Sequence, residues 1–226
     1  MRYEKIITGT FINRPNRFIA YCEIDGSVEK CHVKNTGRCR ELLVKGAKAF
    51  LSVSDNPSRS TKYDVVAVMK GDRLINMDSQ IPNDVAEEGL KRIPDFSDVK
   101  MIRREFTYGD SRIDIMAEDD EKKYLIEVKG VTLENNGVVR FPDAPTERGV
   151  KHIRELMGSI KDNYNPYLLF VIQMDDVLRF EPNRATDPAF ADALREAFDA
   201  GVRILAYTCS VTPDSIELKD SVEVLL

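Results

Sequence analysis

The stretch YLIEVKGVTL (residues 124–133) places two charged side chains, Glu127 and Lys129, in a strand-like segment that is otherwise apolar. Because side chains alternate between the two faces of a strand, Glu127 and Lys129 share one face, and Ile126 and Val128 share the other. A buried charge is costly unless it has an ionic partner or a bound metal ion. The segment therefore predicts either a core strand that carries a functional site or an ion pair on a solvated sheet face.

A second strand-like run, SRIDIM (residues 111–116), places Asp114 between two isoleucines. The acidic, turn-like stretch at residues 118–121 can close a hairpin that brings Asp114 beside Glu127. Two adjacent carboxylates repel one another, and a single lysine neutralises only one of them. A divalent cation removes this conflict, and two carboxylates suit Mg²⁺ or Mn²⁺. Asp114 and Glu127 are thus the candidate metal ligands, and with Lys129, which can hold the attacking water, they form a candidate catalytic set for phosphodiester hydrolysis.

Helical and strand-like patterns alternate around these two runs. Strands are expected at residues 101–107, 111–117, 123–133, 167–174 and 202–207, and helices at residues 83–92, 149–161 and 187–201. The helix caps are expected at Asn83 or Asp84, at Asp143 or Thr146, and at Asp187. This order predicts an α/β domain with a mixed sheet over residues 81–226, in which residues 167–207 form one βαβ unit.

The front of the chain has a different pattern, with short strands separated by turns. Strands are expected at residues 5–13, 17–24, 28–33, 47–53, 63–69 and 74–77. NRPN (residues 13–16) is expected to form a turn, and Asp25 and Gly26 are a hairpin signal. Five or six short strands in this length predict a small β-barrel of the OB type over residues 1–80, and SQIPND (residues 79–84) marks the boundary.

Charge is divided unequally between these two parts. The 226-residue chain has a net charge of −5, but residues 1–80 carry 14 Lys and Arg against 9 Asp and Glu, whereas residues 81–226 carry 19 against 29. A basic front part suggests a partner that carries phosphates. Basic side chains crowd the turn NTG (residues 35–37), and others lie off the apolar stripe of the helix at residues 149–161. From these we select six candidate nucleic-acid contacts: Lys34, Asn35, Arg38, Arg40, Arg148 and Lys151. A solvated loop and an ordinary amphipathic helix are the competing interpretations.

Composition excludes several other classes of protein. No apolar run approaches the roughly 20 residues that span a bilayer, and the first residues lack the apolar core of a secretion signal, so we expect a cytoplasmic protein without a membrane partner. The four cysteines, Cys22, Cys31, Cys39 and Cys209, are too scattered for a disulfide scaffold or a paired-cysteine zinc site. Two histidines rule out a histidine-rich metal site, and the absence of tryptophan argues against a sugar site.

Several motifs occur together and in order along the chain. They are NTGR (residues 35–38), SRID (111–114), EVKGVTL (127–133), FPDAPTERG (141–149), KHIREL (151–156) and ILAY (204–207). With these motifs the chain resembles the sugar fermentation stimulation protein family of bacteria and archaea over nearly its whole length. The resemblance implies an OB-like N-terminal barrel, a C-terminal domain similar to the PD-(D/E)xK nucleases, and DNA binding in the regulation of sugar (maltose) metabolism.

The resemblance also implies roles for single residues. Asp114, Glu127 and Lys129 fall on the acidic pair and the lysine of the nuclease superfamily. Glu87 or Glu88 is a candidate for its first-helix acid, although a solvated helix face explains both as well. The chain departs from the expected pattern in three places: Ile113 stands for a proline, Gly130 for a serine, and Lys34 for the proline before the NTG turn.

Two functions therefore compete. The first is a DNA-binding or RNA-binding protein, without sequence specificity, whose second domain is a Mg²⁺-dependent nuclease. The second is a catalytically silent DNA-binding regulator of sugar metabolism on the same scaffold. A sugar-binding protein is a third and weaker interpretation, and the sequence leaves the oligomeric state open. A working nuclease explains why charges persist in apolar strands, because a pure binding protein gains no stability from them.

Overall fold

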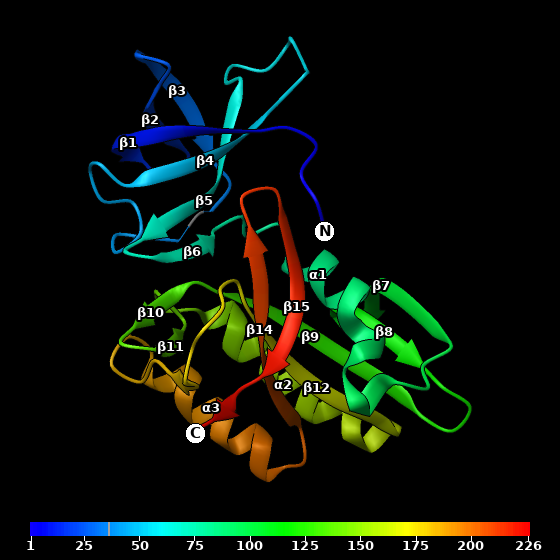
Figure 1. Ribbon diagram of the computed structural model, residues 1–226. Helices are drawn as coiled ribbons and strands as arrows, with labels where there is room; N and C mark the ends of the chain where they lie inside the picture. The colour runs from blue at the N-terminus through cyan, green and yellow to red at the C-terminus, as the bar shows by residue number, and fades with distance from the viewer. Residues whose placement is uncertain (36) are drawn as a thin grey trace.

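The computed structural model describes residues 1–35 and 37–226 and consists of a β-barrel above a larger α/β unit (Figure 1). Thr36, in the middle of the NTG turn, lies outside the described residues. The barrel strands are β1 (Ile6–Asn16), β2 (Ile19–Ile24), β3 (Ser27–Val33), β4 (Lys48–Val53), β5 (Tyr63–Lys70) and β6 (Arg73–Asn76). Parallel pairing of β3 with β5 closes β1 to β5 into a barrel, which confirms the predicted fold of the front part.

Turn chemistry explains where the barrel strands end. Asp25 (φ 50°) and Gly26 (φ 79°) both take positive φ values, as the tight turn between β2 and β3 requires. The turn expected at residues 13–16 is wrong, because β1 continues through Pro15 to Asn16. Two register shifts in its pairing with β2 accommodate the proline within the strand. The chain reverses two residues later, where Asn16 Oδ1 accepts hydrogen bonds from the backbone N–H groups of Phe18 (2.9 Å) and Ile19 (3.1 Å).

A six-stranded mixed sheet forms the centre of the second unit. Its strand order is β15 (Ser215–Ser221), β14 (Arg203–Thr212), β12 (Tyr164–Ile172), β9 (Lys123–Val131), β8 (Ser111–Glu118) and β7 (Met101–Tyr108). Strands β9, β12 and β14 run parallel, and the others are antiparallel to their neighbours, which confirms the mixed sheet. A small second sheet was not expected from the sequence; it contains β10 (Leu133–Asn135), β11 (Val138–Phe141), β13 (Arg179–Pro182) and β16 (Glu223–Val224).

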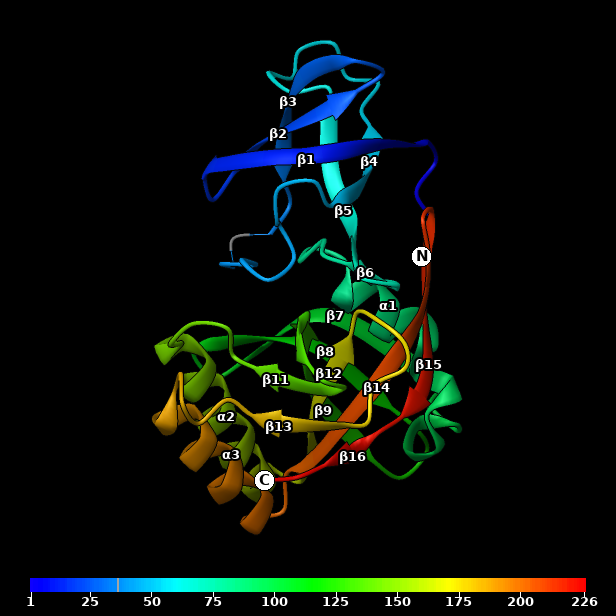
Figure 2. The same ribbon diagram turned by 60° about the vertical axis from the view of Figure 1, so that its left-hand side comes forward.

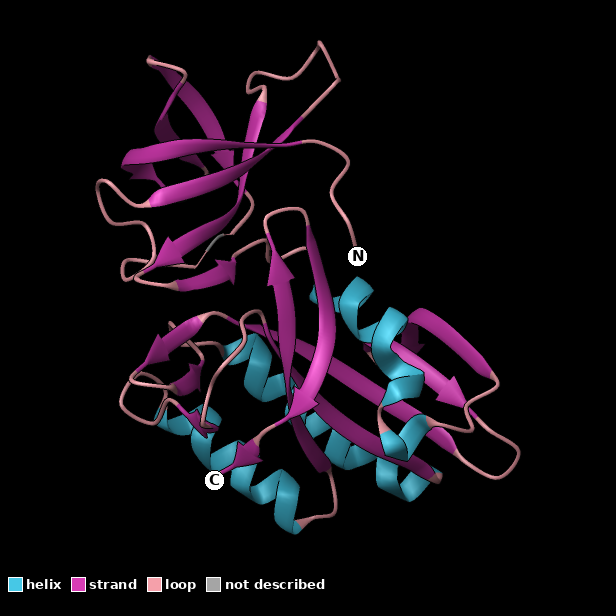
Figure 3. Ribbon diagram, in the orientation of Figure 1, coloured by secondary structure: helices cyan, strands magenta, loops and turns pink. Residues whose placement is uncertain are grey.

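Helices cover both faces of the main sheet (Figure 3). Helix α1 (Pro82–Gly89) shares an apolar cluster with Ile126 and Val128 of β9, whereas α2 (Glu147–Ser159) and α3 (Pro188–Asp199) pack on the other face. Thr146 caps α2 and Asp187 caps α3, and both residues are among the caps expected from the sequence. The cap expected for α1 is wrong: Ile81 precedes the helix, and Pro82, which lacks a backbone N–H, is its first residue.

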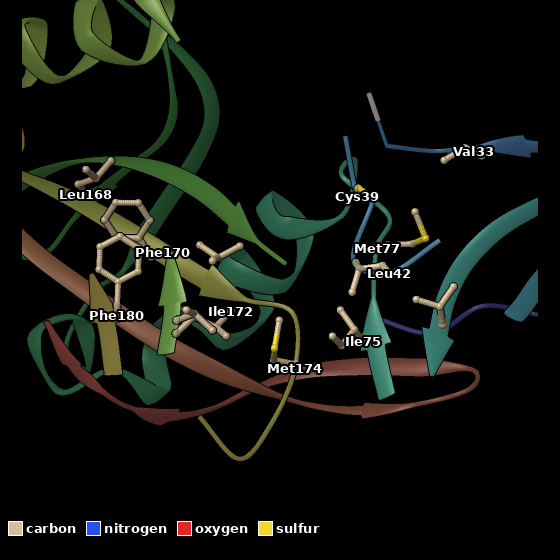
Figure 4. Packing of buried hydrophobic residues seen from close by; sticks show 14 of the residues in the cluster. Val33, Cys39, Leu42, Ile75, Met77, Leu168, Phe170, Ile172, Met174 and Phe180 are labelled. Carbon is tan, nitrogen blue, oxygen red and sulfur yellow. The ribbon is translucent and has the colours of Figure 1, made fainter. Parts of the chain in front are cut away.

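One apolar cluster crosses from the barrel into the second unit (Figure 4). Ile75 and Met77 of the barrel lie in the same cluster as Ile172 and Met174, at the end of β12. A buried polar contact adds to it, since Gln173 Nε2 donates to Asn76 Oδ1 (3.1 Å) and to the Asp78 carbonyl oxygen (2.9 Å). The two units therefore share a core and have a fixed mutual position.

Two further contacts join the units at the surface. The first residues of the chain run beside the β14–β15 hairpin, where the backbone N–H of Tyr3 donates to the Asp214 carbonyl oxygen at 2.8 Å (Figure 2). On another side, Glu134 of β10 pairs with Lys70 (2.7 Å) and Arg73 (2.8 Å) of the barrel. Within the described residues, no helix has the length and apolar character needed to cross a bilayer.

Candidate active site

The antiparallel pairing of β8 with β9 brings Asp114 and Glu127 to the same place. The pairing ends with Ile115 opposite Ile126, one residue before the two acids would face each other. Beyond this point the Asp114 side chain continues the contact with β9 in place of backbone pairing. Its Oδ2 accepts a hydrogen bond from the Val128 N–H at 2.8 Å. The proximity that the hairpin predicts is thus present, and the Asp114 carboxylate is held against β9.

Glu127 has the most buried carboxylate of the site, since its residue is 1% exposed. Its Oε1 accepts hydrogen bonds from two donors, Lys129 Nζ and His152 Nδ1. Its Oε2 is buried and has no hydrogen-bond partner among the described residues. An unpartnered buried carboxylate oxygen is costly, so this atom marks a place where a ligand would be stabilising.

Two further residues, His152 and Asn83, belong to this site and are not predicted from the sequence. His152 lies off the apolar stripe of its helix in the sequence, but it is 7% exposed and faces Glu127. Asn83 was expected to cap α1, but it lies in the first turn and its Nδ2 donates to Asp114 Oδ1 at 2.9 Å. In the sequence, each residue lies near an apolar position of its helix. That position shows that the helix packs on something, but it does not show which strand or which side chain the residue meets.

The two carboxylates differ in their pKa values. Burial raises the pKa of Asp114, and the neighbouring charge of Glu127 raises it further, despite hydrogen bonds from Val128 and Asn83. Burial also acts to raise the pKa of Glu127, but the hydrogen bond from His152 and the charge of Lys129 outweigh it and lower that pKa. The basic partners of Glu127 thus favour its charged form, whereas burial and the neighbouring charge of Glu127 disfavour the charged form of Asp114.

These residues meet the requirements for a hard divalent cation. Its ligands are usually carboxylate and carbonyl oxygens completed by water, and the site offers Asp114 together with the unpartnered Oε2 of Glu127. In residues 1–35 and 37–226 no group of three or more His, Cys, Asp or Glu side chains is arranged around one metal position. An ion here would therefore take two carboxylates and fill its remaining positions with water.

Gly130, the departure next to Lys129, has a packing reason. A Cβ atom at this position would lie 2.6 Å from Pro82 Cγ and 2.6 Å from Gln173 Oε1, which is closer than real Cβ atoms approach other atoms. A serine would therefore displace α1 or the buried Gln173. Gly130 also lines a cavity of 340 Å³ between the barrel and the second unit, together with Thr132 and Asn35.

The arrangement of a barrel followed by a mixed-sheet unit agrees with two known family models. A model described as "Sugar fermentation stimulation protein RE domain" matches residues 80–215, and one described as "SfsA N-terminal OB domain" matches residues 12–77. The chain belongs to the sugar fermentation stimulation protein family. The resemblance seen in the sequence motifs is thereby confirmed.

Individual members of the sugar fermentation stimulation protein family match over the full chain. A sugar fermentation stimulation protein homolog of Clostridium beijerinckii is 55% identical over 226 residues, covering 100% of both chains. The homolog of Ruminiclostridium cellulolyticum is 52% identical, also with 100% coverage of both. The solved structure of Pyrococcus furiosus SfsA in complex with Ca²⁺ is 25% identical and matches with a TM-score of 0.89, covering 100% of this chain and 98% of that one.

The structure turns Glu87 and Glu88 away from the acidic pair. Glu87 lies 3.5 Å from Arg104 on β7, and Glu88 pairs with the amino group of Met1. The side chain of α1 that contacts Asp114 is Asn83, one turn before Glu87. In this member of the sugar fermentation stimulation protein family, the α1 side chain that reaches Asp114 is thus the amide of Asn83, and neither Glu87 nor Glu88 does so.

The described residues around the NTG segment have partners elsewhere in the barrel unit. Asn35 is buried, and its Nδ2 donates to the Met77 carbonyl oxygen at 2.9 Å. Lys34, the departure before this turn, forms a 2.8 Å ion pair with the buried Asp78. Both residues therefore have structural partners, and their nucleic-acid contacts stay a prediction.

The remaining candidate contacts are exposed. Arg38 and Arg40 line a groove of 660 Å³ on the barrel, and the Arg38 backbone N–H donates to Asp143 Oδ2 (2.8 Å) of the loop before α2. The groove thus adjoins the loop before α2, and on that helix Arg148 and Lys151 are exposed. The structure thus places four of the six predicted contacts on the surface.

Proposed function

We propose that the protein binds DNA or RNA along the barrel groove and hydrolyses a phosphodiester bond at Asp114, Glu127 and Lys129 with Mg²⁺ or Mn²⁺. One observation supports this most directly: Glu127 Oε2 is buried without a partner among the described residues, on the strand to which Asp114 is hydrogen-bonded. The Pyrococcus furiosus relative was solved with Ca²⁺, another hard divalent cation. The ion pair between Glu127 and Lys129 involves Oε1 alone, so it does not explain why Oε2 is buried without a partner among the described residues.

The proposed chemistry uses each residue of the site differently. Asp114 and Glu127 would hold the ion, which when bound orients the phosphate and lowers the pKa of water. Lys129, which already donates to Glu127 Oε1, would hold the attacking water and balance negative charge that develops on the phosphoryl oxygens. The water oxygen forms a bond to phosphorus, the bond from phosphorus to the leaving sugar oxygen breaks, and that oxygen takes up a proton.

The barrel groove supplies the proposed nucleic-acid surface. It is lined by Arg14, Arg17, Arg38, Arg40 and Lys45. The Arg14 side chain donates to backbone carbonyl oxygens, among them those of Asn35 and Gly37. None of these five side chains forms an ion pair within the described part of the chain. Unpaired cations are available for phosphates, and contacts of this kind carry no base readout, so binding without sequence specificity is expected.

DNA binding without turnover, as a regulator of sugar metabolism, is the second candidate. It is favoured by the orientation of Glu87 and Glu88, which leaves the site with two carboxylates. The two candidates predict the same salt-dependent binding but differ in whether product forms.

A combined binding and cleavage assay separates the two candidates. Single-stranded, double-stranded and branched DNA and RNA are titrated with protein in Mn²⁺, Mg²⁺ or EDTA, beside Lys129→Ala. Metal-dependent product that disappears in Lys129→Ala supports the nuclease. Binding that weakens with salt, ignores metal and never yields product supports the silent regulator. Arg38→Glu should weaken binding, whereas Lys91→Glu, which changes an exposed lysine after α1, is the matched control; equal effects would contradict the proposed groove.

A further inference from the structure

We propose that His152 and Arg148 form a positioning pair that fixes the Glu127 carboxylate, so that Oε1 is occupied by protein donors and Oε2 is presented to the divalent cation. This inference rests on the proposed function, since it assigns a role toward the same ion. Neither residue touches the ion in this scheme, and both act on it through Glu127.

The hydrogen bonds around His152 determine its tautomer. Arg148 Nε lies 3.2 Å from His152 Nε2. A guanidinium can only donate, so Nε2 must accept, and the proton of the neutral imidazole then lies on Nδ1. Nδ1 faces Glu127 Oε1 and donates to it. Arg148 therefore selects the tautomer that can hold Glu127, although it does not contact Glu127 itself.

The helix that carries this pair is rigidly seated. Ile153 and Leu156 of α2 are buried in the core beneath the main sheet. At its start, Thr146 Oγ1 accepts the Gly149 N–H at 3.0 Å, and a Cβ atom on Gly149 would lie 3.2 Å from Phe190 of α3. His152 thus approaches Glu127 from a fixed backbone, which limits the rotamers that Glu127 can adopt.

Fixing one carboxylate oxygen decides what the other can do. With Oε1 bonded to His152 and Lys129, a rotation of the Glu127 carboxylate would break two hydrogen bonds. Oε2 is then held in a buried position where the described protein offers it no donor. Groups that orient a metal ligand in this way typically change metal affinity about 10- to 100-fold when they are lost.

Two substitutions of His152 separate positioning from packing. Asparagine can place its amide N–H near the position of Nδ1, whereas glutamine places its amide near Nε2. We expect the Mn²⁺ affinity of His152→Asn, measured by calorimetry on the full chain with Mn²⁺ alone, to stay within about threefold of wild type. His152→Gln should bind Mn²⁺ at least about tenfold more weakly. If the residue only filled space, both variants would lose thermal stability and leave Mn²⁺ affinity equal.

Arg148 provides a second test that does not alter the core. In the metal-free protein, ¹⁵N NMR of His152 should show the proton on Nδ1, and Arg148→Met should shift the tautomer toward Nε2–H and weaken Mn²⁺ binding. Lys161→Met removes a positive charge from the same helical segment and is the matched control. Wild-type protein with the proton on Nε2, or Arg148→Met with unchanged tautomer and affinity, would overturn the inference.

The outcomes also distinguish the inference from the proposed function. Wild-type protein that binds Mn²⁺ while His152→Asn and His152→Gln bind it equally well overturns the positioning pair alone. Wild-type protein that binds no Mn²⁺ overturns the metal site and, with it, the pair. Mn²⁺ binding that depends on His152 as expected, without cleavage of any nucleic acid, supports the pair and leaves the silent regulator as the function.

Discussion

Replacing Glu134 by glutamine should weaken the connection between the barrel and the second unit. Glu134 is 5% exposed, and its two oxygens pair with Lys70 (2.7 Å) and Arg73 (2.8 Å) of the barrel. The Gly137 N–H adds a third hydrogen bond, at 2.6 Å. Glutamine keeps the size of the side chain, removes the charge and replaces one of the two acceptor oxygens with an amide donor.

The magnitude follows from the pKa of Glu134. Burial raises this pKa, but the hydrogen bonds from Lys70, Gly137 and Arg73 outweigh burial and lower it from 4.5 to about 2. Because the folded-state pKa lies below the unfolded value, the stabilisation is complete above pH 4.5 and is lost as the pH falls toward 2. This difference corresponds to about 3 kcal/mol, which solvent around the partly exposed Lys70 and Arg73 reduces to about 2 kcal/mol.

Urea unfolding between pH 7 and pH 3 tests this expectation. At pH 7 we expect Glu134→Gln to lose about 2 kcal/mol of unfolding free energy, and the difference from wild type should shrink as the pH approaches 3. Glu121→Gln, in the exposed β8–β9 turn, is the matched control and should change little. A loss that stays constant across this pH range, or one below about 0.5 kcal/mol at pH 7, would refute the reasoning.

Three further substitutions test other parts of the structure. Wild-type protein at a Mn²⁺ concentration about 100 times its dissociation constant should gain about 2.7 kcal/mol of stability, and Asp114→Asn should gain none, as thermal shifts in Mn²⁺ and EDTA would show. Gly130→Ser should lose about 1–3 kcal/mol in urea unfolding, because Pro82 and Gln173 leave no room for Cβ. Asp187→Ala should lose about 1–2 kcal/mol, since Asp187 caps α3 and accepts the Thr146 N–H at 2.8 Å; an unchanged midpoint would contradict either assignment.

Much of the architecture could be predicted because its signals are local. A period of two along residues 124–133 places Glu127 and Lys129 on one face, and the acidic turn before it brings Asp114 near. Asp25 and Gly26 predict the barrel hairpin because few residues accept positive φ. Such signals depend only on neighbours in the chain, and therefore they can be read without the structure.

The unpredicted parts depend on contacts between distant segments. His152 meets Glu127 only because α2 packs on one particular face of β9, and its sequence neighbours do not specify that face. Lys34 resembles a free basic residue until Asp78, more than forty positions later, is placed beside it. The short strands β13 and β16 have weak patterns of their own; β13 forms by pairing with β11, and β16 forms by pairing with β13.

The continuous apolar cluster around Ile75 and Met174 has a consequence for how a long ligand is bound. Two domains joined by a flexible linker lose hinge entropy when one ligand immobilises both, whereas units with a common core have already lost it on folding. A nucleic acid that spans the barrel groove and the acidic pair would therefore bind a preorganised surface. Because the separation of the two surfaces is fixed, any cut would fall at a constant number of nucleotides from the segment held in the groove.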